Sequence, residues 1–231
     1  MENKNNDSPC HALVAGQTIL IDKPYTWTSF DVVSKVRNWA RKESGEKKIK
    51  VGHAGTLDPL ATGLLIICTG KFTKSISSIQ ELSKEYIGTF TLGASTQSYD
   101  LETEITPGGT YQHLNSSHFA NAIQKLTGEI LQIPPVFSAV KVDGKRAYEY
   151  ARKKEELKLL PKSIHIYEFE LTRIALPEID FRVVCSKGTY IRSLAKDFGE
   201  ILGCGAYLSA LRRTRIGEYL VENAINVRDI I

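Results

Sequence analysis

A glycine-rich stretch at residues 52–63 places one histidine, His53, and one aspartate, Asp58, among three glycines. The stretch lies between an apparent strand at residues 49–51 and an apolar run at residues 64–68. Glycine allows the backbone to approach a ligand closely where side chains would obstruct it. An ionised carboxylate in such a loop can act as a nucleophile or take a proton from a bound molecule. We therefore take Asp58 as the first candidate catalytic residue.

Both residues also have a purely structural interpretation. Asp58 followed by Pro59 is a good helix N-cap with proline at the first helical position. His53 is also compatible with a hydrogen-bonded histidine in a core. The neighbouring glycines favour the functional interpretation, because a helix cap does not need them.

Other sequence patterns argue against nucleotide and metal chemistry. The run Thr69-Gly70-Lys71 follows an apolar strand, but a phosphate-binding loop would need glycine in place of Leu65 and a hydroxyl residue in place of Phe72. The sequence contains no His-Glu-x-x-His, Gly-x-Ser-x-Gly or dinucleotide-binding fingerprint. Its four cysteines form no Cys-x-x-Cys pair, which favours free thiols over zinc or disulfides.

The composition is that of a globular protein long enough for one sizeable domain. Of the 231 residues, 42% are hydrophobic and 24% are charged. The polar start indicates a flexible tail at residues 1–16, followed by one domain at residues 17–231. Apolar runs stay short of the ~18 residues of a membrane helix, and the sequence does not open on a secretion signal. We therefore expect no membrane association and a cytoplasmic location.

The formal net charge of +4 is unevenly distributed. Basic residues gather at residues 35–50, at residues 141–162 and in a run of three arginines at 212, 213 and 215. Such patches suit a phosphate backbone, but they are also typical of solvated surfaces. Charge alone leaves the two interpretations open.

The elements that must position the glycine-rich loop follow from residue periodicity and turn residues. Their order indicates an α+β domain around a mostly antiparallel sheet. The expected strands are residues 17–22, 85–92, 130–133, 136–142, 164–174, 178–186 and 207–216. The first expected helix begins at Thr28 or Ser29. The others cover residues 73–82, 116–127, 146–156, 190–202 and 222–231, and the one at 116–127 is expected to have a serine cap.

Several motifs together resemble the TruB family of tRNA pseudouridine synthases, which convert uridine 55 of the T-loop to pseudouridine. The glycine-rich loop, GHAGTLDPLATGLL at residues 52–65, is similar to the family signature. The resemblance extends over roughly residues 17–226. Further matching segments are DKP at 22–24, KEY at 84–86, FSAVK at 137–141, GKRAYEYAR at 144–152, CSKGTYIR at 185–192 and LRRT at 211–214.

The resemblance implies a pseudouridine synthase fold: α+β, with a mixed, mostly antiparallel sheet flanked by helices and a thumb-like RNA-binding insertion at residues 138–162. It implies an isomerase that breaks the bond from ribose C1′ to uracil N1, rotates the base and joins C1′ to C5. That reaction requires no cofactor and no metal. An alternative from another class is a catalytically silent tRNA-binding or tRNA-folding protein.

The implied partner is the T-arm of tRNA. No obligate protein partner is evident, and we expect a monomer. Many bacterial members continue into a small C-terminal RNA-binding domain of the PUA type, whereas this sequence ends at Ile231. We therefore expect RNA binding through the basic clusters, with an affinity that falls as salt rises.

The resemblance also implies roles for single residues. Asp58 corresponds to the catalytic aspartate and Arg192 to the arginine that pairs with it, fixes its orientation and favours its charged form. Tyr86 corresponds to the tyrosine that stacks on the target base and helps to remove the C5 proton. Tyr190 and Leu211 correspond to walls of the same pocket. Taken singly, the last three residues are also compatible with core packing.

The target uridine has to leave its stack, which costs a few kcal/mol. By the resemblance His53 fills the vacated space, and Asp100 is a structural or pocket carboxylate whose substitution should harm less than that of Asp58. The insertion supplies cations suited to phosphate contacts, although a solvated helix remains an alternative. These cations are Arg146, Arg152, Lys153 and Lys154.

Overall fold

The computed structural model describes residues 13–142, 144–153, 155 and 157–230, except for the side chain of Arg152. The chain divides into two compact units. The first unit contains the described residues up to Lys84 and those from Arg212 onward, and the second is Glu85–Leu211. The strand β12 (Ala206–Ile216) contributes its residues up to Leu211 to the second unit and the remainder to the first.

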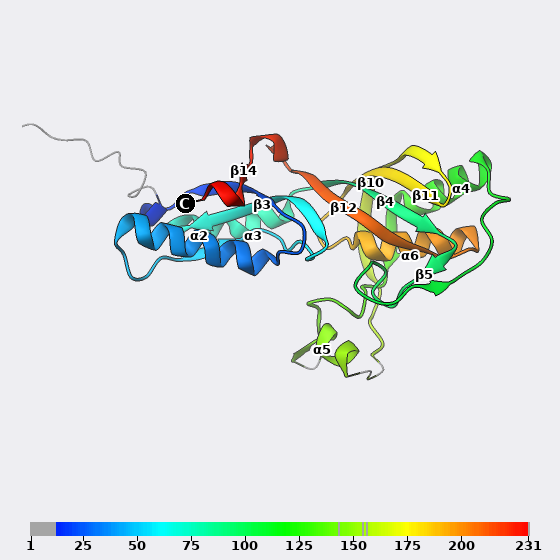
Figure 1. The fold of residues 1–231 in the computed structure, drawn as a ribbon, viewed down its shortest axis with the longest axis horizontal. Helices are drawn as coiled ribbons and strands as arrows, with labels where there is room; N and C mark the ends of the chain where they lie inside the picture. The colour runs from blue at the N-terminus through cyan, green and yellow to red at the C-terminus, as the bar shows by residue number, and fades with distance from the viewer. Residues whose placement is uncertain (1–12, 143, 154, 156, 231) are drawn as a thin grey trace, which may run out of the picture. The chain divides into compact units, whose positions relative to one another are not determined.

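The sheet of the first unit is built on an antiparallel pair of strands (Figure 1). Its strand order is β14 (Ile225–Asn226), β1 (Thr18–Lys23), β3 (Ala61–Thr69) and the end of β12. Two short strands pair outside this order: β2 (Val51–His53) with β3, and β13 (Tyr219–Leu220) with β12. The pair of β1 and β14 is parallel, whereas β2 and β13 pair antiparallel with their neighbours. The strand β3 is almost wholly buried, which explains its unbroken apolar sequence.

Helices bury the two faces of β3. The helix α2 (Ser29–Ser44) packs its valines at 32, 33 and 36 in the core that contains Leu65 and Ile67 of the strand. Leu64 and Ile66 face the opposite way, toward Ile79 of α3 (Ile76–Glu81), which follows the 3-10 helix η1 (Gly70–Ser75). The alternation of side chains along a strand therefore assigns each helix to one face.

Capping residues fix the bounds of α2. Thr28 accepts from the backbone N–H of Asp31, and the Asp31 carboxylate accepts from the backbone N–H of Thr28, which is a capping box. The helix ends at Gly45, whose φ of 72° places it in the left-handed region. This helix confirms the element expected to begin at Thr28 or Ser29.

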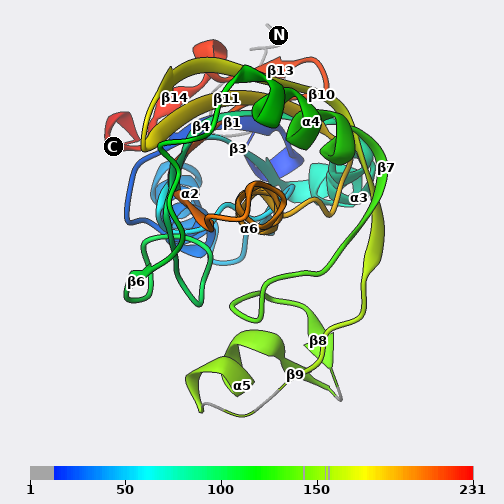
Figure 2. The ribbon, with the colours of Figure 1, turned by 90° about the vertical axis from the view of Figure 1, so that its right-hand side faces the viewer.

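Helices α4 and α6 cover one face of the strands of the second unit, as Figures 1 and 2 show. Phenylalanines from both layers meet there: the centroids of Phe90 and Phe181 lie 4.1 Å apart, and Phe198 of α6 lies 5.5 Å from Phe90. The strand order is β12, β4 (Lys84–Leu92), β11 (Glu178–Cys185), β10 (Lys162–Ala175) and β7 (Gly128–Gln132), and the helices are α4 (Ser116–Leu126) and α6 (Ile191–Leu202).

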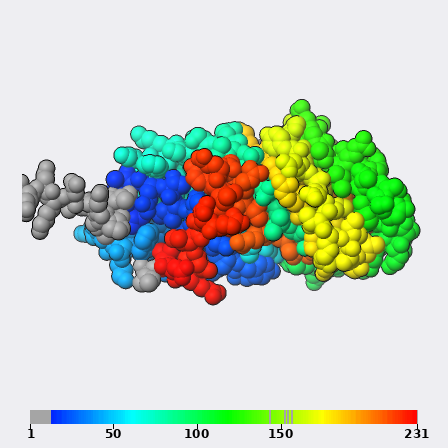
Figure 3. Space-filling model, turned by 90° about the horizontal axis from the view of Figure 1, so that it is seen from above, coloured from blue at the N-terminus to red at the C-terminus, as the bar shows by residue number. Residues whose placement is uncertain are grey.

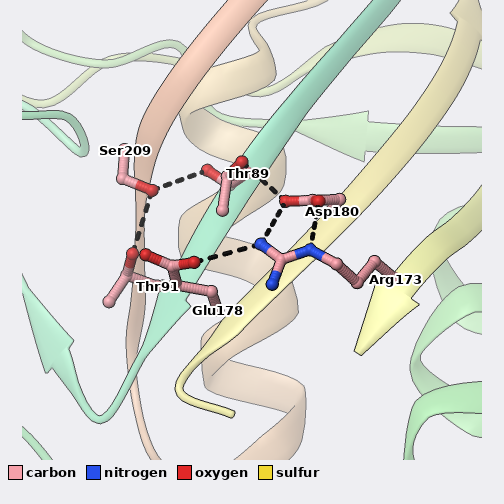
Figure 4. Close-up of polar contacts among 6 residues, drawn as sticks. All are labelled: Thr89, Thr91, Arg173, Glu178, Asp180 and Ser209. Atoms are coloured by element: carbon pink, nitrogen blue, oxygen red, sulfur yellow. Dashed lines mark hydrogen bonds and ion pairs between the residues drawn. The ribbon is translucent and has the colours of Figure 1, made fainter. Parts of the chain in front are cut away.

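The opposite face of these strands is polar. Arg173 of β10 donates to Asp180 of β11 at 2.6 Å and to Glu178 at 3.0 Å, while Thr89 of β4 donates to the same Asp180 carboxylate at 2.8 Å. Figure 4 shows this network continuing through Ser209 of β12. Figure 3 shows the outer surface of β10 and β11 in yellow. Alternating burial along β11 thus separates a solvated face from the aromatic core.

A small hairpin with a helix projects from this unit on the side of α6 (Figure 2). It consists of β8 (Lys141–Val142), β9 (Lys145–Arg146) and α5 (Ala147–Arg152), in which Val142 pairs with Lys145. The insertion anticipated at residues 138–162 contains this hairpin. A separate two-stranded sheet, β5 (Ala94–Ser95) with β6 (Thr106–Pro107), lies in the loop that follows β4.

Several predicted elements were wrong. The described part of the helix predicted at residues 222–231, residues 222–230, is not an α-helix, because Val221–Asn223 and Val227–Asp229 are 3-10 turns around β14. Residue 231 lies outside the described residues. In the segment predicted as a strand at 136–142, only Lys141–Val142 is extended in a ladder.

Three helices differ in their bounds or cap. The element predicted at 73–82 is split between a 3-10 helix and α3, and that predicted at 146–156 ends at Arg152. Asn115, not a serine, caps α4. The α+β class and the mostly antiparallel pairing are confirmed.

Residues 13–16, which the composition assigned to the tail, include a packed side chain. Leu13 is 1% exposed and belongs to the core that also contains Val32 and Val36 of α2. Packing in the first unit therefore includes part of the segment expected to be a tail. Across the described residues, none of the helices is both long enough and apolar enough to cross a membrane.

Candidate functional site

Asp58 lies in a turn between β2 and β3 and is half-buried. The backbone N–H of Ala61 donates to the carbonyl oxygen of Asp58 at 3.1 Å, which closes a four-residue turn directly before β3 begins. Because a strand and not a helix follows, the N-cap interpretation of Asp58 is wrong. The carboxylate is carried by a tight connection between two paired strands.

Both neighbours of Asp58 are held by residues near the start of α2. The hydroxyl of Ser29 accepts from the N–H of Leu57 at 2.9 Å and donates to the Leu57 carbonyl at 3.1 Å. On the other side, the N–H of Thr26 donates to the carbonyl oxygen of Pro59 at 2.9 Å. Bonds on both sides of Asp58 limit its backbone freedom and thereby preorganise its side chain.

A buried ammonium group lies beneath this turn. The Lys23 side chain is fully buried, and its Nζ donates to the carbonyl oxygens of Pro24, Trp27 and Pro59 at 2.9, 2.6 and 3.3 Å. Burial lowers the pKa of Lys23 to about 8, although the negative charge of Asp58 opposes that shift. The ammonium of Lys23 is therefore part of the electrostatic environment of the Asp58 carboxylate.

A buried guanidinium holds the other half of the loop. Arg213 is 1% exposed, and it donates to the carbonyl oxygens of Gly55 at 3.1 Å and Leu64 at 2.8 Å. A third bond to the carbonyl of Thr56 measures 3.4 Å. The planar fork of arginine can satisfy several backbone acceptors at once. Arg213 is thus buried in the fold and is not available to a phosphate backbone, contrary to the interpretation of the arginine run as an RNA track.

The glycines of the loop have packing roles. At Gly63, with φ of 102°, a Cβ would collide with the backbone of Arg213 on β12. At Gly52, a Cβ would lie 2.7 Å from the Cδ1 atom of Ile76. Gly63 is therefore required by the backbone of β12, whereas the contact at Gly52 is with the end of a flexible side chain.

His53 ends β2 and is half-buried. Burial lowers the pKa of its imidazole; a backbone hydrogen bond at Gly55 opposes this shift, and the charge of Arg213 adds to it by a smaller amount. The ring is therefore neutral near pH 7. Its Nδ1 atom is buried without a hydrogen-bond partner among the residues that the structure describes. A neutral planar ring five positions before Asp58 is suited to stacking on a base.

The second unit contributes a buried ion pair. Nε of Arg192, in the first turn of α6, lies 3.7 Å from Oδ2 of Asp100. The guanidinium also donates to the carbonyl oxygens of Ser98 at 3.3 Å and Phe137 at 2.9 Å. Two predicted site residues, Arg192 and Asp100, are therefore brought together. The pairing of Arg192 with Asp58 stays a prediction.

The loop that carries Asp100 is tightly bonded. Thr96 Oγ1 donates to the Asp100 carbonyl at 2.7 Å, and Asp100 Oδ1 accepts from the N–H of Glu102 at 3.0 Å. Tyr99, immediately before, has φ of 64°, a conformation that few residues other than glycine adopt. Its carbonyl accepts from the N–H of Leu208 on β12 at 2.9 Å. A strained backbone held on several sides keeps the Asp100 carboxylate in place.

The remaining pocket candidates lie in the second unit. Tyr86 on β4 is 9% exposed. Tyr190, directly before α6, and Leu211, on β12, are half-buried. Each has further contacts in the fold. Their contact with a base stays a prediction.

The phosphate-binding candidates lie in the projecting hairpin and helix. Arg146 and Lys153 are exposed, although one guanidinium nitrogen of Arg146 donates to the carbonyl of Ala139 at 2.7 Å. Lys154 and the side chain of Arg152 lie outside the described residues. Among the other basic residues, Arg212 forms a two-pronged pair with Asp22 at 3.0 and 2.7 Å. Its charge is therefore neutralised within the first unit.

Sequence reasoning missed Lys23, Ser29 and Arg213 as supports of the loop. A signal existed for Lys23, because side chains on β1 alternate and Lys23 falls on the buried face with Ile19 and Ile21. Arg213 had no such signal, since burial along β12 does not alternate strictly. Ser29 was noticed only as a possible helix cap.

Two family profiles match the chain. The one described as "TruB family pseudouridylate synthase (N terminal domain)" matches residues 41–191. The one described as "tRNA pseudouridylate synthase B C-terminal domain" matches residues 192–231. Together they extend over most of the chain and include every site residue predicted from the sequence, whereas Lys23 and Ser29 lie before the matched residues.

Curated relatives are similar along nearly the whole chain. The tRNA pseudouridine synthase B of Flavobacterium johnsoniae is 57% identical over 213 residues, which cover 92% of this chain and 93% of the relative. The tRNA pseudouridine synthase B of Phocaeicola vulgatus is 55% identical over 212 residues, with 92% and 90% covered.

Solved structures with the same fold include larger proteins. A chain of a Cbf5-Nop10-Gar1 complex has a TM-score of 0.69 and 28% identity, covering 98% of this chain and 59% of that one. A chain of an H/ACA RNP bound to a substrate RNA containing 2′-deoxyuridine has a TM-score of 0.67 and 27% identity, with 98% and 58% covered. The present chain thus spans less than two thirds of those chains.

Proposed function

Because the chain belongs to the TruB family of pseudouridylate synthases, we propose that it converts uridine 55 in the T-loop of tRNA to pseudouridine. The chain has the pseudouridine synthase fold, and it is a tRNA pseudouridine synthase, an isomerase. The position of the uridine and the role of each residue are the proposed part. The observation that carries the proposal is the turn at Asp58, which is bonded on both sides of a half-buried carboxylate.

The proposed reaction is an isomerisation, in which every bond broken and formed belongs to the same nucleotide. The bond from C1′ to N1 breaks, the uracil rotates, a bond from C1′ to C5 forms, and the hydrogen on C5 is exchanged for one on N1. The Asp58 carboxylate acts directly on the nucleotide, either as a nucleophile toward ribose or base or as a base toward a ribose proton. Fixing its backbone in advance lowers the entropic cost of reaching the reactive geometry.

The other candidates surround the nucleotide in this proposal. Arg192 orients the catalytic carboxylate, and Tyr86 stacks on the base and helps to remove the C5 proton. Tyr190 and Leu211 form pocket walls. His53, neutral because burial lowers its pKa, stacks in the space that the flipped uridine leaves.

The insertion binds the RNA backbone in this proposal. Its hairpin and helix project from the second unit on the side of α6, which also carries Arg192 (Figure 2). Lys145, Arg146 and Lys153 are exposed there. Cations of this kind contact phosphates and orient the T-arm without reading its sequence.

The test combines tritium release with mapping of the product. tRNA labelled with tritium at uracil C5 is incubated with the native chain, with Asp58→Asn and with the matched control Asp229→Asn, an exposed aspartate near the C-terminus. We expect release and pseudouridine at position 55 with the native chain and the control, and neither with Asp58→Asn.

Each other outcome contradicts a different part of the proposal. Full release by Asp58→Asn would remove that residue from the mechanism. Pseudouridine formed only at another tRNA position would overturn the T-loop assignment. Tight tRNA binding by the native chain without any release would favour a silent tRNA-binding or tRNA-folding protein.

A further inference from the structure

The segment that contains the insertion leaves and rejoins the sheet at one residue pair, Gln132 and Lys162. The chain leaves the sheet after Gln132, the last residue of β7, and returns at Lys162, the first residue of β10. These two residues are partners in the antiparallel ladder between the strands. The insertion is therefore connected to the sheet at this residue pair.

The Gln132 side chain points away from that ladder into the fold. It is 2% exposed, and its Oε1 accepts from the backbone N–H of Tyr190 at 2.8 Å. That N–H fixes the orientation of the amide, since only the oxygen can accept. The opposite atom, Nε2, is buried without a partner among the described residues. A buried donor without a partner costs stability, so the Gln132 amide adds little net stability to the fold.

Two further bonds connect the following residues to the same turn of α6. Ser193 is fully buried, and its hydroxyl donates to the carbonyl oxygen of Ile133 at 2.7 Å. Arg192 donates to the carbonyl of Phe137 at 2.9 Å. Between these points the buried Pro134 and Pro135 restrict the backbone. The root of the insertion, residues 132–137, is thus a stiff segment bonded to Tyr190, Arg192 and Ser193.

We propose that Gln132 and Ser193 are positioning residues that hold Tyr190 and Arg192 in register with the root of the insertion. This inference rests on the proposed function, in which Tyr190 and Arg192 act at the nucleotide and the insertion binds the RNA. Neither Gln132 nor Ser193 contacts the RNA in this scheme. They fix where α6 begins relative to the segment that carries the RNA-binding hairpin.

The first test separates turnover from binding. Gln132→Met keeps the length of the side chain and removes the acceptor, Gln132→Glu keeps an acceptor oxygen, and Ser193→Ala removes the hydroxyl. Gln124→Met, on the exposed face of α4, is the matched control. A site displaced by about 1 Å can lose ~100-fold in rate.

We therefore expect Gln132→Met and Ser193→Ala to lower the single-turnover rate at saturating tRNA about 10- to 100-fold. The Kd for tRNA should change less than about twofold, and Gln132→Glu should recover most of the rate. Gln124→Met should behave as the native chain. Unchanged rates in both Gln132→Met and Ser193→Ala would overturn the inference. So would equal losses of rate and affinity, which would make these residues part of RNA binding, or an equal rate loss in Gln132→Met and Gln132→Glu.

A second measurement does not depend on turnover. Amide hydrogen exchange at Tyr190 should be faster in Gln132→Met than in the native chain, and tRNA should slow exchange across the first turn of α6 less in that variant. Equal exchange in the two proteins would overturn the inference. If the native chain forms no pseudouridine at position 55, the proposed function fails, and these exchange rates then decide the inference by themselves. Thermal melts of each variant show whether it is folded.

Discussion

Nε of Arg192 lies 3.7 Å from Oδ2 of Asp100, in a pair whose side chains are only 5% and 7% exposed. The guanidinium also donates to the backbone carbonyls of Ser98 and Phe137. Asp100 thus supplies one carboxylate to this buried cation. Removing one partner of a buried ion pair is strongly destabilising, at a cost of about 3–5 kcal/mol.

Asp100→Asn should therefore destabilise the protein and slow turnover. The substitution keeps the shape of the side chain but leaves the buried guanidinium of Arg192 without this negative charge. We expect a lower Tm and a rate loss smaller than that of Asp58→Asn, because Asp100 acts through Arg192 and not on the nucleotide. Thermal melts and single-turnover assays measure the two effects. An unchanged Tm would contradict the energetic role of the pair.

Arg192→Ala should reduce turnover more than RNA binding. Arg192 is 4% exposed, so its guanidinium is poorly placed to contact a phosphate. In the proposed function its removal disorganises the Asp58 carboxylate, while the exposed cations of the insertion still hold the tRNA. Single-turnover rates and a Kd from filter binding provide the comparison. Parallel losses in both quantities would favour a direct RNA contact.

The sequence predicted elements well where local signals and tertiary packing agree. The stripe of valines and the Thr28–Asp31 capping box define α2 without reference to the rest of the chain. Near the C-terminus the local signal and the tertiary packing disagree. The local pattern predicts a helix at residues 222–231, but Ile225 and Asn226 pair with β1 in a parallel ladder. Pairing with a distant strand overrode the local preference, and no local pattern records such a partner.

The candidate site shows the same division. The family motifs singled out Asp58 and Arg192, and the resemblance suggested Asp100, but neither indicated that Asp100 forms an ion pair with Arg192. Gln132 and Ser193 are ordinary polar residues in the sequence. Only their burial and their bonds to Tyr190 and Ile133 distinguish them. Polar residues that support a site by tertiary contacts leave little trace in local spacing.

Lys23 should give the protein an alkaline increase in stability. Its pKa in the folded protein is about 8, below the ordinary value of 10.5. Between these values the unfolded chain binds more protons, so the free energy of unfolding rises with pH, by at most about 1.4 kcal/mol per pH unit for one proton. Urea unfolding at pH 7, 8.5 and 10 should show this slope in the native chain. Lys23→Met should show a smaller slope, and equal slopes would contradict the lowered pKa.

Neutralising the insertion should weaken tRNA binding in a salt-dependent way. Each phosphate contact contributes about 0.7–0.9 to the slope of log K against log salt. The combined change of Arg152, Lys153 and Lys154 to glutamine should raise the apparent KM and flatten that slope, with little effect on the rate at saturating tRNA. Lys125→Gln, on the exposed face of α4, is the control. An unchanged salt slope in the triple variant would argue against phosphate contacts there.

Two arginines on strands should respond very differently to removal. Arg173 lies on the solvated face, with its side chain 48% exposed, and pairs with Glu178 and Asp180. Exposed pairs contribute about 0–1 kcal/mol, so Arg173→Met should leave the Tm nearly unchanged. Arg213 is 1% exposed and donates to the carbonyl oxygens of Gly55 and Leu64 in and beside the catalytic loop.

Arg213→Met leaves those buried acceptors unpaired, at about 1–3 kcal/mol each. We therefore expect a large fall in Tm and a loss of turnover, because the same bonds fix the segment before Asp58. Arg213→Lys should recover little of either, since one ammonium cannot reproduce the planar fork of donors. Thermal melts and single-turnover assays of the three variants test the contrast. A Tm for Arg213→Met as high as that for Arg173→Met would show that the loop carrying Asp58 does not depend on the buried guanidinium.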